Sequence, residues 1–156
     1  MRLYHGTPYG YFDFADYVGE YAFFTTSKEV AREYTRALIQ SGKKPEGAKI
    51  GPTILEVDVT LATGSIFNTA REPDRTLYTR LVRQARAALP DDDWPSGQLM
   101  VTYLDEYTSV LLPPWSDVKT LMPYIIDEGF RAAWVSEGSQ GASLVVHHPQ
   151  DVVRPA

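Results

Sequence analysis

The 156-residue chain contains no cysteine, which excludes disulfides, thiolate nucleophiles and every metal site that depends on cysteine ligands. It has only three histidines, His5, His147 and His148. The last two are adjacent, so on a strand they would point to opposite faces, and no HExxH spacing is present. We therefore expect no metal centre. The chemistry must come from oxygen and nitrogen groups.

Several common catalytic motifs are also missing. The sequence has no Walker-type phosphate loop, no GxGxxG turn and no GxSxG nucleophile elbow. Positive charge is scarce, since 15 basic residues face 20 acidic ones and give a net charge of −5. A surface that binds duplex nucleic acid needs the opposite balance, so obligate nucleic-acid binding is disfavoured.

Long apolar runs are absent as well. No stretch approaches the roughly 18 apolar residues of a membrane span, and the N-terminal residues lack the apolar core of a signal peptide. These absences predict a cytoplasmic protein without a membrane partner.

Length and composition are those of one globular domain. A chain of this size buries about 70% of the surface that it exposes when extended, which is enough for a real core. A hydrophobic share of 44% and a charged share of 22% exclude disordered and collagen-like chains. We therefore predict a single domain over residues 1–156.

Strand and helix signals follow one another in blocks. Alternating polarity and β-branched or aromatic residues predict strands at 2–5, 21–25, 53–61, 64–68, 132–136 and 142–147. Apolar residues at helical spacing predict helices at 26–41, 74–89, 96–112 and 117–127. The first helix begins with a capping box of Thr26 and Glu29, and Pro123 is expected to bend or shorten the last. With a helical insertion over about 70–128, the predicted class is α+β.

The first 34 residues are crowded with aromatic side chains and offer one candidate site. His5 ends the first predicted strand beside Gly6, whose backbone a ligand can approach closely. The spacing from Phe23 to Tyr34 places one ring on a strand and the other in the second turn of the following helix. Two rings so placed can sandwich a flat heteroaromatic ligand. The alternative is an ordinary aromatic core with a strand-end histidine whose hydrogen bond is satisfied.

Six motifs follow one another in a characteristic order: YHGT at 4–7, FFTT at 23–26, SKEVAREY at 27–34, EGF at 128–130, AWV at 133–135 and SLVVHHPQDV at 143–152. In order and spacing they resemble the ADP-ribosyltransferase domain of the diphtheria-toxin and poly(ADP-ribose)-polymerase type. The chain looks most similar to the small bacterial and phage versions found in polyvalent proteins and toxins. The resemblance covers about residues 2–41 and 124–153. It implies split, strongly curved β-sheets that form a cleft for NAD.

The resemblance also implies roles for individual residues. His5 would hold the adenosine ribose of NAD, and Gly6 would present backbone groups to the nicotinamide carboxamide. Thr7, the last residue of the YHGT motif, is counted with them as a cofactor-binding residue. The nicotinamide ring would stack on the aromatic pair formed by Phe23, with its neighbour Phe24, and Tyr34. One departure is Ala31, which stands where the family has a serine that hydrogen-bonds the carboxamide.

A second departure concerns the catalytic acid. The family's glutamate at the start of the closing strand aligns with Ser143, which can only hydrogen-bond. Breaking the nicotinamide glycosidic bond creates an oxocarbenium-like centre that a carboxylate stabilises. Glu137, six positions earlier on the connecting turn, is the candidate replacement. The candidate catalytic residues are therefore Glu137, Ser143 and His5. Either Glu137 supplies the carboxylate, or the protein binds NAD without full transfer activity.

The resemblance thus implies a mono-ADP-ribosyltransferase that uses NAD as substrate and releases nicotinamide. It would act in a bacterial cytoplasm, or in host cytoplasm as a phage or toxin effector. The acceptor, which is a protein, nucleic acid or small molecule, is not specified by residues 42–52 and 70–128. Water as acceptor would make an NAD glycohydrolase, and an RNA 2′-phosphate would make a phosphotransferase. The alternative of another class is a non-catalytic NAD-binding or interaction module.

Overall fold

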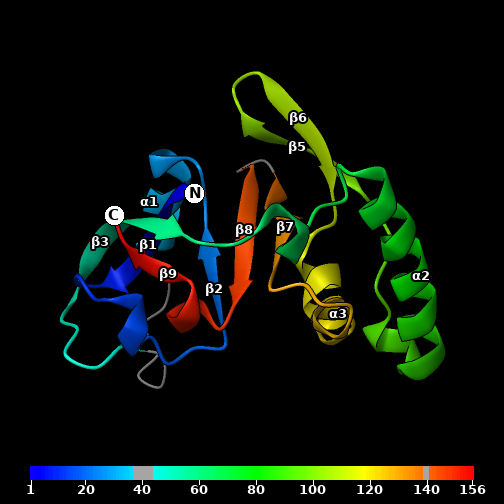
Figure 1. Cartoon of the computed structure of the whole chain (residues 1–156), viewed down its shortest axis with the longest axis horizontal. Helices are drawn as coiled ribbons and strands as arrows, with labels where there is room; N and C mark the ends of the chain where they lie inside the picture. The colour runs from blue at the N-terminus through cyan, green and yellow to red at the C-terminus, as the bar shows by residue number, and fades with distance from the viewer. Residues whose placement is uncertain (37–43, 139–140) are drawn as a thin grey trace. The chain divides into compact units, whose positions relative to one another are not determined.

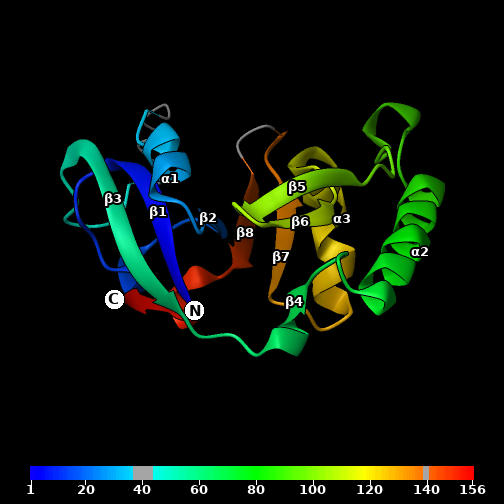
Figure 2. The same ribbon diagram turned by 90° about the horizontal axis from the view of Figure 1, so that it is seen from above.

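The computed structural model describes residues 1–36, 44–138 and 141–156 (Figure 1). The chain divides into two compact units, one formed by Met1–Leu61 with Leu144–Ala156 and the other by Ala62–Ser143. We call these unit 1 and unit 2. Each combines helix with open β-structure, so the class is α+β (Figure 2). No helix in the described part of the chain is both long and apolar enough to cross a membrane.

Unit 1 contains an antiparallel three-stranded sheet. Its order is β1 (Arg2–Tyr9), β3 (Ile50–Val59) and β9 (Val153–Pro155). β3 has the predicted alternation, with every second side chain from Leu55 to Val59 buried. A second antiparallel pair joins β2 (Tyr21–Phe24) to Leu144–His147 of β8 (Ala142–His147). The predicted strands at 21–25, 53–61 and 142–147 are confirmed to within a few residues, whereas β9 was not predicted.

The first strand is longer than predicted, because β1 does not stop at Gly6. Its pairing with β3 continues regularly to Thr7, and the register then shifts before Tyr9. Pro8 lies in this irregularity, where its missing N–H breaks no ladder hydrogen bond. The expectation that the first strand ends at His5 is therefore wrong.

The helix α1 (Lys28–Tyr34) follows β2 in unit 1. Its cap is Ser27 rather than Thr26: the Ser27 Oγ accepts a hydrogen bond from the Val30 N–H at 3.4 Å and donates one to the Glu29 carboxylate at 3.0 Å. The helix ends at Tyr34, several residues earlier than predicted. Residues 37–41 of the predicted helix lie outside the described residues.

Unit 2 holds two longer helices and two small groups of strands. The helices are α2 (Glu72–Ala88) and α3 (Trp115–Asp127), which confirm the predictions at 74–89 and 117–127. α3 is not shortened at Pro123. β4 (Ile66–Phe67) pairs in parallel with β7 (Ala132–Ser136), close to two predicted strands.

The predicted helix at 96–112 is wrong. The structure has a β-hairpin there, formed by β5 (Met100–Asp105) and β6 (Thr108–Leu112), so the insertion at 70–128 is only partly helical. Strand residue types such as Val101, Thr102 and Tyr103 dominate β5, and they favour a pleated surface over a helix. The Asp105 carboxylate accepts the Tyr107 N–H at 2.9 Å and thereby fixes the turn.

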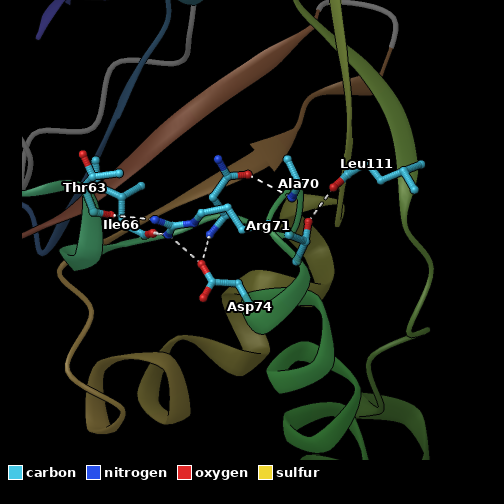
Figure 3. Close-up of polar contacts among 8 residues, drawn as sticks. Thr63, Ile66, Ala70, Arg71, Asp74 and Leu111 are labelled. Carbon is cyan, nitrogen blue, oxygen red and sulfur yellow. Dashed lines mark hydrogen bonds and ion pairs between the residues drawn. The ribbon is translucent and has the colours of Figure 1, made fainter.

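A partly buried polar cluster joins β4 to the start of α2 (Figure 3). The Arg71 guanidinium donates to the carbonyls of Thr63 and Ile66 and forms an ion pair of 2.6 Å with Asp74. The same Asp74 carboxylate accepts the Asn68 N–H at 2.9 Å. Arg71 therefore neutralises a buried carboxylate and satisfies carbonyls of β4 and of the 3₁₀ turn before it, which orients α2 within unit 2.

Candidate functional site

The candidate residues fall into two groups. Unit 1 contains His5, Gly6, Thr7, Phe23, Phe24 and Tyr34, and unit 2 contains Glu137 and Ser143. Among the described residues, no group of three or more potential metal ligands is present.

The site in unit 1 is organised by one bridge between β1 and β2. The Tyr4 N–H donates to the Thr25 carbonyl at 2.8 Å, and the Thr25 N–H donates back to the Tyr4 carbonyl at 2.9 Å. Both backbone groups of Tyr4 thus point away from β3. Because backbone directions alternate along a strand, the N–H and C=O of Gly6 point the same way as those of Tyr4.

Gly6 therefore presents a backbone donor and a backbone acceptor at the edge of β1 that faces away from β3. The described residues provide no hydrogen-bond partner for either group. Its neighbours His5 and Thr7 turn their backbone groups toward β3, where they pair with Leu55 and Thr53. The free pair of groups at Gly6 is suited to a planar primary amide, which also has one donor and one acceptor side.

The Cα of Gly6 is covered by α1. A Cβ at this position would overlap the Ala31 carbonyl oxygen and would lie 3.1 Å from the Tyr34 Cβ. Glycine is thus required here for close packing of helix on strand, and this packing brings Tyr34 next to Gly6. The sequence predicts that a ligand can approach the backbone of Gly6 closely. Because α1 covers the Cα, only the N–H and C=O at the strand edge are left for such a contact.

Phe23 and Phe24 are adjacent on β2, so their side chains point to opposite faces of the strand. Phe24 is buried and packs on Phe14 with ring centroids 5.1 Å apart. It belongs to the core of unit 1. Phe23 and Tyr34 are both half-buried, so they are the aromatic candidates that keep some exposed surface, although the Tyr34 hydroxyl itself is buried.

His5 lies among core aromatics but keeps one ring nitrogen available. Its Nδ1–H donates to the Phe23 carbonyl at 2.8 Å, and its ring contacts Phe14 and Phe24 with centroids 5.0 and 5.4 Å away. Since Nδ1 carries the proton, Nε2 is an acceptor in the neutral ring. Nε2 has no partner among the described residues and is not among the fully buried polar atoms.

Burial lowers the pKa of His5 to about 4, and the hydrogen bond to the Phe23 carbonyl opposes this effect only in part. The imidazole is therefore neutral at pH 7. A neutral Nε2 can accept a hydrogen bond from a hydroxyl group.

Thr7 is buried, and its hydroxyl accepts the Tyr9 N–H at 3.1 Å. This bond spans the irregularity in β1 that Pro8 occupies. In the described structure Thr7 thus has a local structural role, and its hydroxyl faces no open surface.

In unit 2, Glu137 directly follows β7 and is half-buried. Its N–H donates to the Gly141 carbonyl at 2.8 Å, and Gly138 and Gly141 adopt positive φ values of 65° and 106°. Only glycine adopts such angles without strain, so these residues define the turn that carries Glu137. Ser139 and Gln140 of this turn lie outside the described residues.

Ser143 is 0% exposed. Its hydroxyl has no hydrogen-bond partner among the described residues, which is unusual for a buried polar group. The next residue, Leu144, pairs with Phe24. A ligand does not reach the Ser143 hydroxyl in this structure.

Sequence reasoning gave no individual role to Gln150, which lies within the closing motif. Its Nε2 donates to the carbonyls of Tyr17 and Gly19 at 2.5 and 3.3 Å. These hydrogen bonds connect the C-terminal part of unit 1 to the loop that precedes β2. The sequence offered no signal for these partners, because a carbonyl acceptor can belong to any residue type.

Compared with family models, curated protein sequences and solved structures, the chain has no significant match.

Proposed function

We propose that the protein is a mono-ADP-ribosyltransferase that takes NAD as substrate and releases nicotinamide. The observation that carries the proposal is the backbone edge of Gly6. Phe23 and Tyr34, which are both half-buried residues, come from the two elements that adjoin it.

The nicotinamide carboxamide matches this edge in its chemistry. Its NH₂ donates to the Gly6 carbonyl and its oxygen accepts from the Gly6 N–H, so both backbone groups are satisfied at once. The ring of nicotinamide stacks on Phe23 and Tyr34, for which flat aromatic faces are suited. Ala31 provides no side-chain hydrogen bond, so the backbone of Gly6 supplies the amide recognition by itself.

His5 serves the sugar part of NAD in this proposal. Its Nε2 accepts a hydrogen bond from a ribose hydroxyl, while its Nδ1–H stays on the Phe23 carbonyl. The low pKa keeps the imidazole neutral, which preserves Nε2 as an acceptor over the physiological pH range. His5 thus serves in binding, and because its ring is neutral it adds no positive charge next to the transition state.

The proposed reaction breaks the bond between ribose C1′ and the nicotinamide nitrogen, and the pair of electrons leaves with nicotinamide. An acceptor group then forms a bond to C1′ and loses its proton. Positive charge develops on the ribose in between, and a carboxylate stabilises it. We assign this role to Glu137 on its place in the sequence, since Ser143 has no charge and is fully buried.

A second candidate function is an NAD-binding module without catalysis. The observation that favours it is Ser143, which stands at the family's glutamate position and is inaccessible to ligands. An NAD glycohydrolase would use the same residues with water as acceptor. An RNA 2′-phosphotransferase is disfavoured by the net charge of −5.

Two measurements test the proposal. NAD at a hundredfold excess over its dissociation constant is expected to stabilise the fold by about 2.7 kcal/mol, and free nicotinamide is expected to accumulate. An NAD analogue with an acetyl group in place of the carboxamide lacks the NH₂ donor. It should bind about tenfold to a hundredfold more weakly, because the Gly6 carbonyl is left unpaired.

A melting temperature that does not respond to millimolar NAD would remove both candidate functions. Stabilisation by NAD without nicotinamide release would favour the binding module. Equal affinity for NAD and the acetyl analogue would contradict the role of Gly6. Formation of free ADP-ribose alone, with no transfer to any added acceptor, would indicate the glycohydrolase.

A further inference from the structure

The β5–β6 hairpin of unit 2 has one anchored face and one apolar exposed face. Thr102 and Leu112 are buried on the inner face, and the Thr102 hydroxyl donates to the Ser136 hydroxyl of β7 at 2.7 Å. The Leu111 carbonyl also accepts a hydrogen bond of 2.5 Å from the Thr69 hydroxyl. A two-stranded hairpin is marginal by itself, so these contacts hold it in a fixed position on unit 2.

The outer face has three large apolar side chains and one serine, Ser109. Val101 pairs with Leu111 and Tyr103 with Ser109, so Val101, Tyr103 and Leu111 share the face opposite Thr102. Val101 is 64% exposed and Tyr103 66%, and Tyr107 at the turn is 91% exposed. The hairpin is formed by the two yellow-green strands in Figure 1. We call Val101, Tyr103, Tyr107 and Leu111 the hairpin face.

Exposing adjoining apolar side chains to water is unfavourable in free energy. Contiguous exposed apolar surface is therefore typical of interaction sites. It is also preorganised, because the hydrogen bonds of Thr102 and Leu111 already fix the strands that carry it. Ordering the surface therefore adds little to the cost of binding a partner.

The charged residues of the hairpin itself, and of the chain segment that contains it, are all acidic. Asp105 and Glu106 lie at its turn and are exposed. The chain segment 87–118, which contains the hairpin, has six acidic residues and no lysine or arginine. Since the whole chain has a net charge of −5, this segment holds the entire negative excess and the rest of the chain is close to neutral.

We propose that the hairpin face docks a basic polypeptide that offers apolar side chains between lysines or arginines. The apolar side chains of the partner cover Val101, Tyr103 and Leu111, and its cations pair with Asp105 and Glu106. This interaction needs no NAD and stands independently of the proposed activity.

Charge and size argue against other occupants. Nucleic acids and anionic membranes would be repelled by a segment without a single cation. A second copy of the chain would bring an equally acidic segment. The hairpin face is also far smaller than the 20–30 residues that each partner contributes to a typical stable interface. A short extended segment of a basic protein fits a surface of this size.

The test uses the full chain, isotope-labelled for NMR, and three 12-residue peptides with blocked ends. The probe alternates lysine with valine and tyrosine. One comparison peptide has glutamate in place of lysine, and the other has serine in place of valine and tyrosine. We expect only the probe to shift the methyl signals of Val101 and Leu111 and the ring signals of Tyr103. The affinity should fall as salt is raised.

Substitutions separate the apolar and the charged contributions. Val101→Ser with Tyr103→Ser should weaken the probe by about tenfold or more, because anchor side chains dominate small interfaces. The matched control is Val18→Ser with Tyr11→Ser in unit 1, whose side chains are 56% and 68% exposed, and it should leave binding unchanged. Asp105→Asn with Glu106→Gln removes the charge and keeps an acceptor for the Tyr107 N–H, so the turn persists while affinity falls.

Several results would overturn the proposal. They are absence of probe binding at millimolar concentration, equal binding of the serine or glutamate peptide, and equal loss in the Val18 and Tyr11 control. A dimer in analytical ultracentrifugation that Val101→Ser with Tyr103→Ser converts to a monomer would make the hairpin face a self-association surface instead. Unchanged thermal unfolding of each variant establishes that it is folded.

Discussion

Gly6 of β1 and Ala31 of α1 are in such close contact that a Cβ on Gly6 would overlap the Ala31 carbonyl oxygen. The bridge between Tyr4 and Thr25 and the register of β1 on β3 place the N–H and C=O of Gly6 on the side of the strand that faces away from β3. Gly6 therefore allows α1 to pack closely on the sheet of unit 1, and its two backbone groups are those that we propose for binding a ligand amide.

Gly6→Ala is expected to destabilise the fold by about 3 kcal/mol or more, because the methyl group meets backbone atoms that cannot rotate away. Urea unfolding with the midpoint and slope compared to wild type measures this loss. Gly51→Ala in β3 is the matched control, since a Cβ there meets nothing within 4 Å. Equal stabilities of the two variants would mean that α1 does not pack on Gly6.

The stability of the fold should depend on pH through His5. Its pKa is about 4 in the folded protein against 6.5 for an ordinary histidine, mainly because of burial. The unfolded chain therefore binds a proton between these values that the folded chain does not. The contribution of His5 is fully present above about pH 6.5 and is lost as the pH falls toward 4, by about 3 kcal/mol in total.

Urea unfolding at pH 7, 6, 5 and 4.5 checks this dependence. His5→Asn keeps a donor near the position of Nδ1 but does not titrate, so its stability should fall less steeply over the same range. Parallel curves for the wild type and His5→Asn would show that the ring protonates without cost in the fold.

Two substitutions test whether the ring of Tyr34 contacts NAD: one removes the ring and the other removes only the hydroxyl. Tyr34→Ala should abolish NAD binding, whereas Tyr34→Phe should lose little, because the ring face supplies the contact. Isothermal titration with NAD gives both affinities, and Tyr11→Ala is the control for removal of an exposed tyrosine in unit 1. Equal damage from Ala and Phe would assign Tyr34 a hydrogen-bonding role.

Local sequence signals predicted most elements but not the hairpin. The alternation in β3 and the apolar spacing of α2 have strong periods, and both elements form where expected. Residues 96–112 contain apolar positions that satisfy a helical period as well as a strand period. The pairing of β5 with β6 and the hydrogen bond between Thr102 and Ser136 favour the strand. The second contact spans 34 residues, so local periodicity does not reveal it.

Local sequence signals also predicted only part of the candidate site. The sequence identified His5, Gly6, Phe23 and Tyr34 as a group, and the structure gathers them in unit 1. The sequence also included Phe24 among the binding residues, which is a core residue in the structure. Which of two adjacent strand residues faces the core depends on what covers each side of the strand. The backbone edge of Gly6 was also beyond the sequence, since it follows from the bridge between Tyr4 and Thr25.

The buried hydroxyl of Ser143 leads to an unusual expectation. Ser143→Ala should stabilise the fold by about 1–3 kcal/mol in the absence of ligand, because an unpartnered polar atom is removed from the interior. Thr102→Val is the contrasting variant, since the Thr102 hydroxyl is hydrogen-bonded to Ser136 and its loss should destabilise. Chemical unfolding of both variants measures the difference, and a destabilised Ser143→Ala would mean that the hydroxyl has a partner.

The catalytic carboxylate is the least conventional part of the proposal, and Glu137→Gln tests it. This substitution preserves the size of the side chain but deletes the charge that stabilises the oxocarbenium-like transition state. NAD affinity should therefore survive while nicotinamide release falls about a hundredfold to a thousandfold. Glu128→Gln is the control, since Glu128 forms a surface ion pair with Arg80 at 3.0 Å and is given no catalytic role.

Ser143→Glu gives the reciprocal experiment. Ser143 is fully buried, so a carboxylate there would be desolvated, and we expect loss of stability with no gain in turnover. Ser143→Gln separates the effect of size from that of charge. If Glu137→Gln leaves turnover unchanged and Ser143→Glu also fails to raise it, neither position supplies the carboxylate. A wild type that releases no nicotinamide but gains activity in Ser143→Glu would instead identify an NAD-binding module that lacks only its acid.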